Sequence, residues 1–112
     1  MSDRELLDLA AKAAGYRIKF GASGDPYIQA GMNTRAWNPL TDDGDALRLS
    51  FELRLSMEFL QGFKQVHAYH QADPNQLFGL VGYGSGADKE PTLENVRLAI
   101  VKAAATIGRA MS

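Results

Sequence analysis

The sequence predicts a small α+β domain in which an antiparallel sheet packs against N-terminal, central and C-terminal helices. Two observations predict this class. Apolar residues recur at helical spacing near both ends of the chain, and they alternate with polar residues in several short segments between. Glycine, proline, asparagine and aspartate cluster between these segments and mark turns. The chain has 112 residues, which suits a single domain spanning residues 1–112.

We expect the first helix over residues 2–14. Ser2 and Glu5 have the spacing of a capping box, which satisfies free N–H groups at the start of a helix. Leu6 and Leu9 belong to an apolar stripe at helical spacing. Gly15 is a natural stop for this helix, because glycine adopts the left-handed backbone conformation without Cβ strain.

Residues 16–36 are expected to add two short strands. Apolar and basic residues alternate over 16–20, which is typical of a strand. A loop rich in glycine follows over 21–26, and residues 27–30 are expected to return as a partner strand. We expect residues 31–35 to be irregular.

Residues 42–60 carry two conflicting patterns. Apolar and polar residues alternate strictly over 47–59, as in a strand, but the same stretch also places apolar residues at helical spacing. A single strand of that length would greatly exceed the usual ~5–6 residues. We therefore predict a helix over 42–53 followed by a strand over 55–60, with one long strand as the alternative.

The last part of the chain predicts strands over 64–70 and 78–83 and a final helix over 92–110. Thr92 is a typical helix cap, and apolar residues after it recur at helical spacing. The two terminal helices are expected to press their apolar stripes against the sheet. Six stripe residues are predicted to share one core: Leu6, Leu9, Leu93, Val96, Ile100 and Ile107.

Composition excludes several classes of function. The chain has no cysteine, so disulfides, thiolate metal sites and cysteine chemistry are ruled out. Its net charge of −1 provides no broad basic field, so we expect no nucleic-acid partner. The charged N-terminus lacks a signal-peptide core, and no apolar run approaches the ~20 residues of a membrane span. We expect a soluble cytoplasmic protein without membrane partner, cofactor or metal.

Three stretches carry a family resemblance. Trp37-Asn38-Pro39 leads into an acidic turn and an apolar run up to residue 49, and similar motifs lie at residues 3–15 and 97–109. Together they resemble small phage and prophage proteins of the phage α-β-α sandwich family. The resemblance implies a helix at each end, a helix after the Asn-Pro turn and an antiparallel sheet between, in a protein of the host cytoplasm. It implies no activity and no catalytic residues.

Residues 16–36 depart from that family, whose members pass from the first helix to the tryptophan motif much faster. We expect this insertion to form a β-hairpin or loop on the edge of the sheet. It mixes aromatic, basic and glycine residues, and loops held on a rigid scaffold often carry function. We therefore predict that it carries the partner-binding surface, with a tolerated surface extension as the alternative.

Two motifs invite a metal-site interpretation, and a structural role is favoured for both. Asp42, Asp43 and Asp45 resemble part of a calcium loop, but Leu53 occupies the position of its final glutamate. Acidic residues also complement the positive end of a helix dipole, and we favour that role. His67 and His70 would point to opposite faces of a strand, so surface histidines are favoured over a metal or acid–base pair.

Two further features each have a structural and a functional interpretation. The run from Gly82 to Gly86 resembles a phosphate-binding loop but lacks the residues that complete one, so a flexible connection is favoured. Trp37 is the only tryptophan and precedes a helix. We favour a hydrophobic staple into the core, with an exposed interface anchor as the alternative.

These observations favour a non-enzymatic phage or prophage accessory protein that binds a host protein, and counter-defence is one form of that function. The alternative is a small-molecule-binding protein with a nucleotide-like ligand. An enzyme is the least favoured of the three functions. The sequence leaves the oligomeric state open, a homodimer included. The candidate ligand- or partner-binding residues are Tyr27, Arg35, Trp37, His67, Tyr69 and Tyr83.

Overall fold

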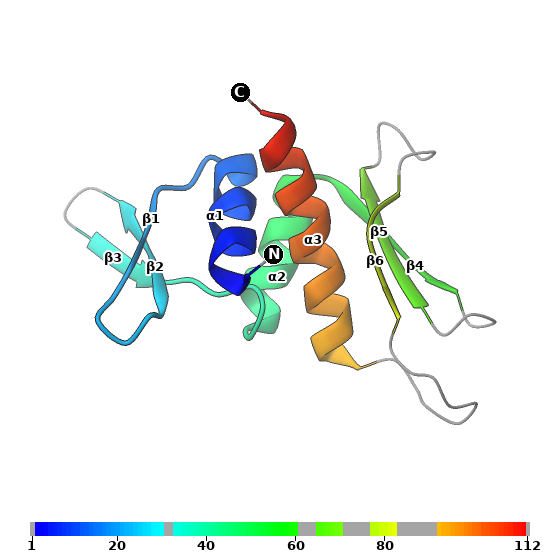
Figure 1. Cartoon of the computed structure of the whole chain (residues 1–112), viewed down its shortest axis with the longest axis horizontal. Coiled ribbons are helices and arrows are strands. Elements are labelled where there is room, and N and C mark those ends of the chain that lie inside the picture. The colour runs from blue at the N-terminus through cyan, green and yellow to red at the C-terminus, as the bar shows by residue number, and fades with distance from the viewer. Residues whose placement is uncertain (1, 31–32, 61–64, 71–76, 83–91, 112) are drawn as a thin grey trace.

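The fold consists of a layer of helices with a small antiparallel sheet on either side (Figure 1). The computed structural model describes residues 2–30, 33–60, 65–70, 77–82 and 92–111. Within them the order is α1 (Asp3–Ala14), β1 (Ile18–Phe20), β2 (Pro26–Ala30), β3 (Asn33–Ala36), α2 (Asp43–Glu52), β4 (Leu55–Leu60), β5 (Gln65–His70), β6 (Leu77–Gly82) and α3 (Leu93–Ala110). The predicted α+β class is confirmed.

The ends of the helices follow the capping chemistry that the sequence predicts. The N–H of Glu5 donates to the Ser2 hydroxyl at 3.2 Å, and the N–H of Asn95 donates to the Thr92 hydroxyl at 3.1 Å. Gly15 ends α1 with a φ of 79°, in the left-handed region that favours glycine. The first and last helices therefore begin at the caps expected for them.

The insertion forms a three-stranded sheet of its own, so two expectations about residues 16–36 are wrong. Residues 31–35 are not all irregular, because β3 pairs antiparallel with β2. This sheet also lies on the opposite side of the helices from the sheet of β4–β6, so it does not extend the edge of the β4–β6 sheet (Figure 1). Its inward residue Ile28 joins the main core, and the Arg4 guanidinium of α1 lies 4.3 Å from the centre of the Phe20 ring. The helix layer is what holds this sheet.

The ambiguous segment resolves as a helix followed by a strand, as predicted. Asp42 caps α2 by accepting the N–H of Asp45 at 2.8 Å. Arg54, with a φ of 55°, reverses the chain between α2 and β4. β4 then pairs antiparallel with β5, and β5 pairs with β6 around a register shift between Val66 and Ala68.

Helices α1 and α3 pack closely because small residues line their contact. Ala10, Ala11 and Ala104 are fully or almost fully buried. At Gly108 the two backbones approach so closely that an added Cβ would overlap the carbonyl oxygen of Leu9. The opposite side of α3 packs Ala99 and Ala103 against Val66 and Ala68 of β5. Helix α3 is therefore buried between α1 and the second sheet.

The predicted core is correct in part. Leu6 and Ile100 are buried, and Leu9 and Val96 are partly buried against the same core. Ile107 is also partly buried. Leu93 is 63% exposed, so its placement in the core is wrong. It is the first residue of α3, and the buried residues of that helix begin at Ala99.

Gly108→Ala tests the close contact of α1 and α3. Alanine favours a helix by about 1 kcal/mol over glycine, but here the methyl group would collide with the Leu9 backbone. We expect a net loss of at least about 2 kcal/mol of unfolding free energy, measured by urea denaturation. Gly44→Ala is the matched control, because the atoms nearest to its Cβ are the flexible ends of the Asp42 and Arg48 side chains. Equal stability of the two variants would contradict this packing.

Candidate functional site

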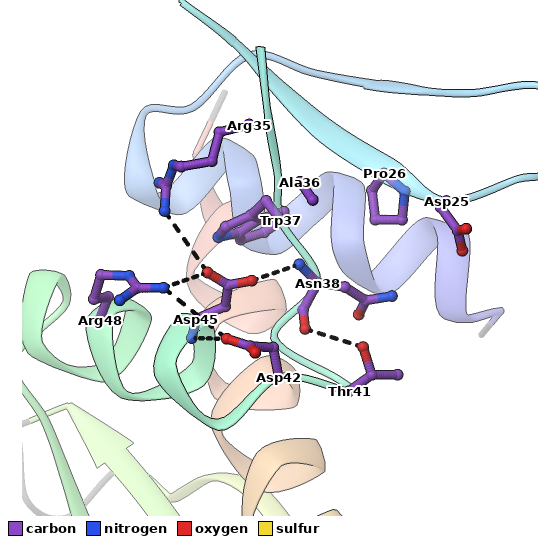
Figure 2. Close-up of a pocket in the computed structure, with 10 residues that line it drawn as sticks. All are labelled: Asp25, Pro26, Arg35, Ala36, Trp37, Asn38, Thr41, Asp42, Asp45 and Arg48. Carbon is purple, nitrogen blue, oxygen red and sulfur yellow. Dashed lines mark hydrogen bonds and ion pairs between the residues drawn. The ribbon is translucent and has the colours of Figure 1, made fainter.

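A polar pocket lies where the end of β3 meets the start of α2. It encloses about 540 Å³ and is lined by residues of the insertion, the following turn and α2 (Figure 2). We call it the Asp45 pocket. Its lining residues are Asp25, Pro26, Arg35, Ala36, Trp37, Asn38, Thr41, Asp42, Asp45 and Arg48.

The turn between β3 and α2 is fixed by Asn38. Its side-chain oxygen accepts the N–H of Leu40 at 3.0 Å, and its carbonyl accepts the N–H of Asp42 at 2.9 Å. The carbonyl of Leu40 in turn accepts Nε of Arg97 from α3 at 2.8 Å. These bonds hold the turn against both α2 and α3 beside the pocket.

Asp45 is the buried centre of this pocket. Its side chain is only 7% exposed, and Oδ2 accepts the backbone N–H of Asn38 at 2.9 Å. Oδ1 accepts Nη2 of Arg48 at 2.7 Å (Figure 2). A buried carboxylate is stable when it is paired and hydrogen-bonded in this way. The hydrogen bond with Asp45 raises the pKa of Arg48 above that of an ordinary arginine.

Arg35 stands on the other side of the same carboxylate. Its Nη1 lies 3.8 Å from Oδ1 of Asp45, which is an ion-pair distance but too long for a hydrogen bond. Arg35 pairs with Ile28 in the sheet register, so both residues occupy the inward face. The strand pairing therefore brings this charged side chain to the pocket.

Trp37 is held by an aromatic contact next to this cluster. It is 2% exposed, and the Tyr16 ring meets it edge to face with centroids 5.7 Å apart. The Tyr16 hydroxyl donates to Oε1 of Glu52 at 2.7 Å. Burial and this hydrogen bond raise the pKa of Tyr16 to about 12. The staple interpretation of Trp37 agrees with its burial, and the exposed-anchor alternative is wrong.

A second, apolar groove of about 370 Å³ lies between α2, β4 and the start of α3. We call it the α2–α3 groove. Its floor and walls are mainly apolar, with an ion pair between Arg97 and Asp43 at its polar side. The lining residues are Asp43, Ala46, Leu47, Ser50, Met57, Phe59, Leu93, Val96, Arg97 and Ile100.

One wall of the groove comes from α2, which carries more apolar residues than one buried face can hold. Ala46 and Leu49 are buried in the core, whereas Leu47 is 69% and Phe51 67% exposed. The strict alternation over 47–59 was the sequence signal for this, because an alternating pattern wound into a helix presents apolar side chains on two sides. Sequence analysis used that pattern to assign secondary structure and missed its consequence for the surface.

The candidate residues named from sequence do not form one site. Arg35 and Trp37 meet at the Asp45 pocket. Tyr27 pairs with Ala36 and so lies on the opposite face of the first sheet from Arg35. His67 and Tyr69 belong to β5, in the sheet on the far side of the helices (Figure 1). Tyr83 lies outside the described residues, as does most of the run from Gly82 to Gly86.

The histidine and aspartate expectations have different outcomes. His67 is 8% exposed, so the interpretation as a surface histidine is wrong for it, because the middle strand of a sheet is covered from both sides by its neighbours. The side chain of His70 is outside the described residues. The three aspartates cap or follow the start of α2, as the dipole argument expects. Within the described ranges, no three histidine, aspartate or glutamate side chains are grouped as metal ligands would be.

Sequence reasoning missed Asp45, Arg48 and Asn38 as members of a site. Their spacing in α2 and the preceding turn gave a helix start but no sign that the Asp45 side chain is buried. Chemically, the pocket offers fixed hydrogen-bond donors and paired charges, and the groove offers apolar surface. Comparison with protein-family models, curated proteins and solved structures finds no match for this chain. None of the helices in the described part of the chain is both long and apolar enough to cross a membrane.

Asp45→Ala tests the buried carboxylate. The variant would leave the Asn38 N–H and the Arg48 guanidinium without their acceptor, and we expect a loss of about 2–3 kcal/mol in unfolding free energy. Asp43→Ala is the control two residues away, because the Asp43 side chain is 61% exposed in its ion pair with Arg97 and its loss should cost less than about 1 kcal/mol. Chemical denaturation at pH 7 measures both, and equal losses would contradict the central role of Asp45.

The Tyr16 phenol should lose its proton at a higher pH than an ordinary tyrosine. Its raised pKa of about 12 means that the folded state favours the neutral phenol. The stabilisation is therefore complete below pH 10, the ordinary tyrosine pKa, and is lost as pH rises through about 12. Absorbance of phenolate at 295 nm, compared between the wild type and Tyr16→Phe, isolates this residue. Glu52→Gln should lower the Tyr16 pKa, and a Tyr16 that titrates near 10 in the wild type would contradict the structure.

Proposed function

We propose that this chain is a non-enzymatic phage or prophage accessory protein that binds a host protein through the α2–α3 groove. The observation that carries the proposal is the exposure of three large apolar side chains around one groove. Leu47 is 69%, Phe59 49% and Leu93 63% exposed. Apolar side chains gathered around one concave surface mark interaction sites more often than single exposed residues do.

The form of the groove supports a protein segment as the ligand. Met57, Val96 and Ile100 form its apolar floor, while Leu47, Phe59 and Leu93 stand at its sides. An amphipathic segment can place its apolar residues in such a groove and its polar residues towards solvent. The Asp43–Arg97 ion pair at one side offers charged groups to a polar rim.

Phe51 provides the contrast within the same helix. It is 67% exposed, but the Arg54 guanidinium covers its ring at 4.8 Å and it does not line the groove. Isolated exposed apolar residues are common on protein surfaces and need no partner. The proposal therefore rests on the clustering of the groove residues and not on exposure alone.

The phage or prophage origin and the host partner rest on the family resemblance of residues 3–15, 37–49 and 97–109. Interference with a host defence protein is one form of this function. The non-enzymatic nature of the protein is supported by what the two sites offer, which is apolar surface in one and, in the other, a buried carboxylate whose two oxygens already accept hydrogen bonds.

Leu47→Glu and Phe51→Glu form a matched pair for testing the groove. Both place a charge at a similarly exposed position of α2, but only Leu47 lines the groove. We expect an affinity-tagged wild type and Phe51→Glu to retain the same protein from a bacterial lysate, and Leu47→Glu to lose it. Loss by at least tenfold in affinity corresponds to one central apolar contact, about 1.4 kcal/mol or more.

Two controls make the result decisive. The melting temperatures of both variants should lie close to that of the wild type, because neither residue is buried. Sedimentation of the purified variants then distinguishes a foreign partner from a second copy of this chain. Unchanged binding by Leu47→Glu would place the binding surface elsewhere.

A further inference from the structure

Two hydrogen-bond donors at the Asp45 pocket lack an acceptor within the described part of the chain. The first is the Arg35 guanidinium, whose nearest carboxylate oxygen is 3.8 Å away on Asp45. A guanidinium has five N–H groups in a planar fork, and a carboxylate or phosphate fits two of them at once. Arg35 therefore reaches the pocket with its donors unused.

The second donor is the indole N–H of Trp37. The side chain is 98% covered, since it is 2% exposed, yet the described residues give its nitrogen no acceptor. No fully enclosed side-chain nitrogen or oxygen in those residues lacks a partner, so the indole nitrogen keeps some exposed surface. Trp37 lines the Asp45 pocket. Figure 2 shows the indole nitrogen on the side of the ring that faces Arg35. An acceptor placed there would satisfy a donor that is otherwise mostly withdrawn from water.

The fold fixes the relative positions of these two donors. Arg35 lies in β3 and Trp37 follows two residues later, so the extended chain directs both to the same face. The Tyr16 ring, at 82° to the indole, holds its orientation. Donors held in place before a ligand arrives lose little freedom on binding.

The acidic residues of the pocket do not fill the same role. Both oxygens of Asp45 already accept hydrogen bonds, from the Asn38 N–H and from Arg48. Asp42 accepts the N–H of Asp45 and lies 4.0 Å from Arg48. Asp25 is the third carboxylate of the lining. The negative charge of the pocket is compensated by Arg48 and by the ion pair of Arg35 with Asp45. The Arg35 side chain is still 53% exposed, so its remaining N–H groups are open to an external anion.

We propose that the Asp45 pocket binds the oxyanion group of a small molecule, a carboxylate or a phosphate, between the Arg35 guanidinium and the Trp37 indole N–H. The oxyanion accepts two parallel N–H groups from Arg35 and one from Trp37. This site lies apart from the α2–α3 groove and does not depend on the function proposed for it. It gives the chain a site for a small anionic ligand.

The single tryptophan allows a direct test. A ¹H–¹⁵N spectrum of the whole chain contains one indole N–H peak, which belongs to Trp37. We expect this peak to move with saturation as sodium phosphate or sodium acetate is added, while sodium chloride at equal ionic strength leaves it in place. If phosphate alone moves the peak, the site binds phosphate; if both anions move it, the site accepts either oxyanion.

Arg35→Gln should weaken the binding at least about tenfold, because a charge-assisted pair of hydrogen bonds is lost. Arg17→Gln is the matched control, since Arg17 is exposed beside the same sheet and does not line the pocket. Arg35→Lys keeps the charge without the planar fork and should also weaken binding. This second variant tests the site if Arg35→Gln does not fold. The proposal is overturned if chloride moves the peak as phosphate does, if no anion moves it, or if the Arg35 variants bind like the wild type.

Discussion

The close contact between α1 and α3 is the constraint on which the rest of the fold depends. Its residues are small, and at Gly108 the helix backbones approach so closely that no side chain fits beside the Leu9 carbonyl. With α3 held there, one side of it can face α1 and the other can face the sheet of β4–β6. The insertion sheet then packs against the helix layer from the opposite side (Figure 1). Neither three-stranded sheet has to supply a core of its own, because each covers a face of the same helical layer.

Helix α2 fills the remaining side of this layer and divides its surface three ways. Ala46 and Leu49 face the core. Asp45 and Arg48 face the pocket beside the insertion sheet, and Leu47 faces the groove beside β4. Helix α2 has only ten residues. Residues that would face only solvent in a simple amphipathic helix therefore line the pocket or the groove in α2. The two candidate sites are thus consequences of one helix placed between two sheets.

The helices and the second sheet could be predicted because their signals are local. Caps at Ser2 and Thr92, the stop at Gly15 and the short alternating runs each act within a few residues. β3 was missed because its pairing with β2, and not its own weak pattern, makes it a strand. Leu93 was misplaced because helical spacing predicts which face of a helix is buried. It does not predict how far along the helix other elements cover that face. Arg35 and Trp37 were named as candidates, but Asp45 was not, because burial of a helix-start aspartate depends on a turn that folds back over it.

Two aspartates at the start of α2, Asp43 and Asp45, point to different sites. Asp43 pairs with Arg97 towards the groove, and Asp45 pairs with Arg48 towards the pocket. These pairings satisfy most of the charge at this end of the helix from within the chain. What remains available differs on the two sides: unused N–H donors of Arg35 and Trp37 in the pocket, and exposed apolar side chains in the groove. Because donors select acceptors and apolar surface selects apolar surface, the two sites favour ligand groups of different chemistry.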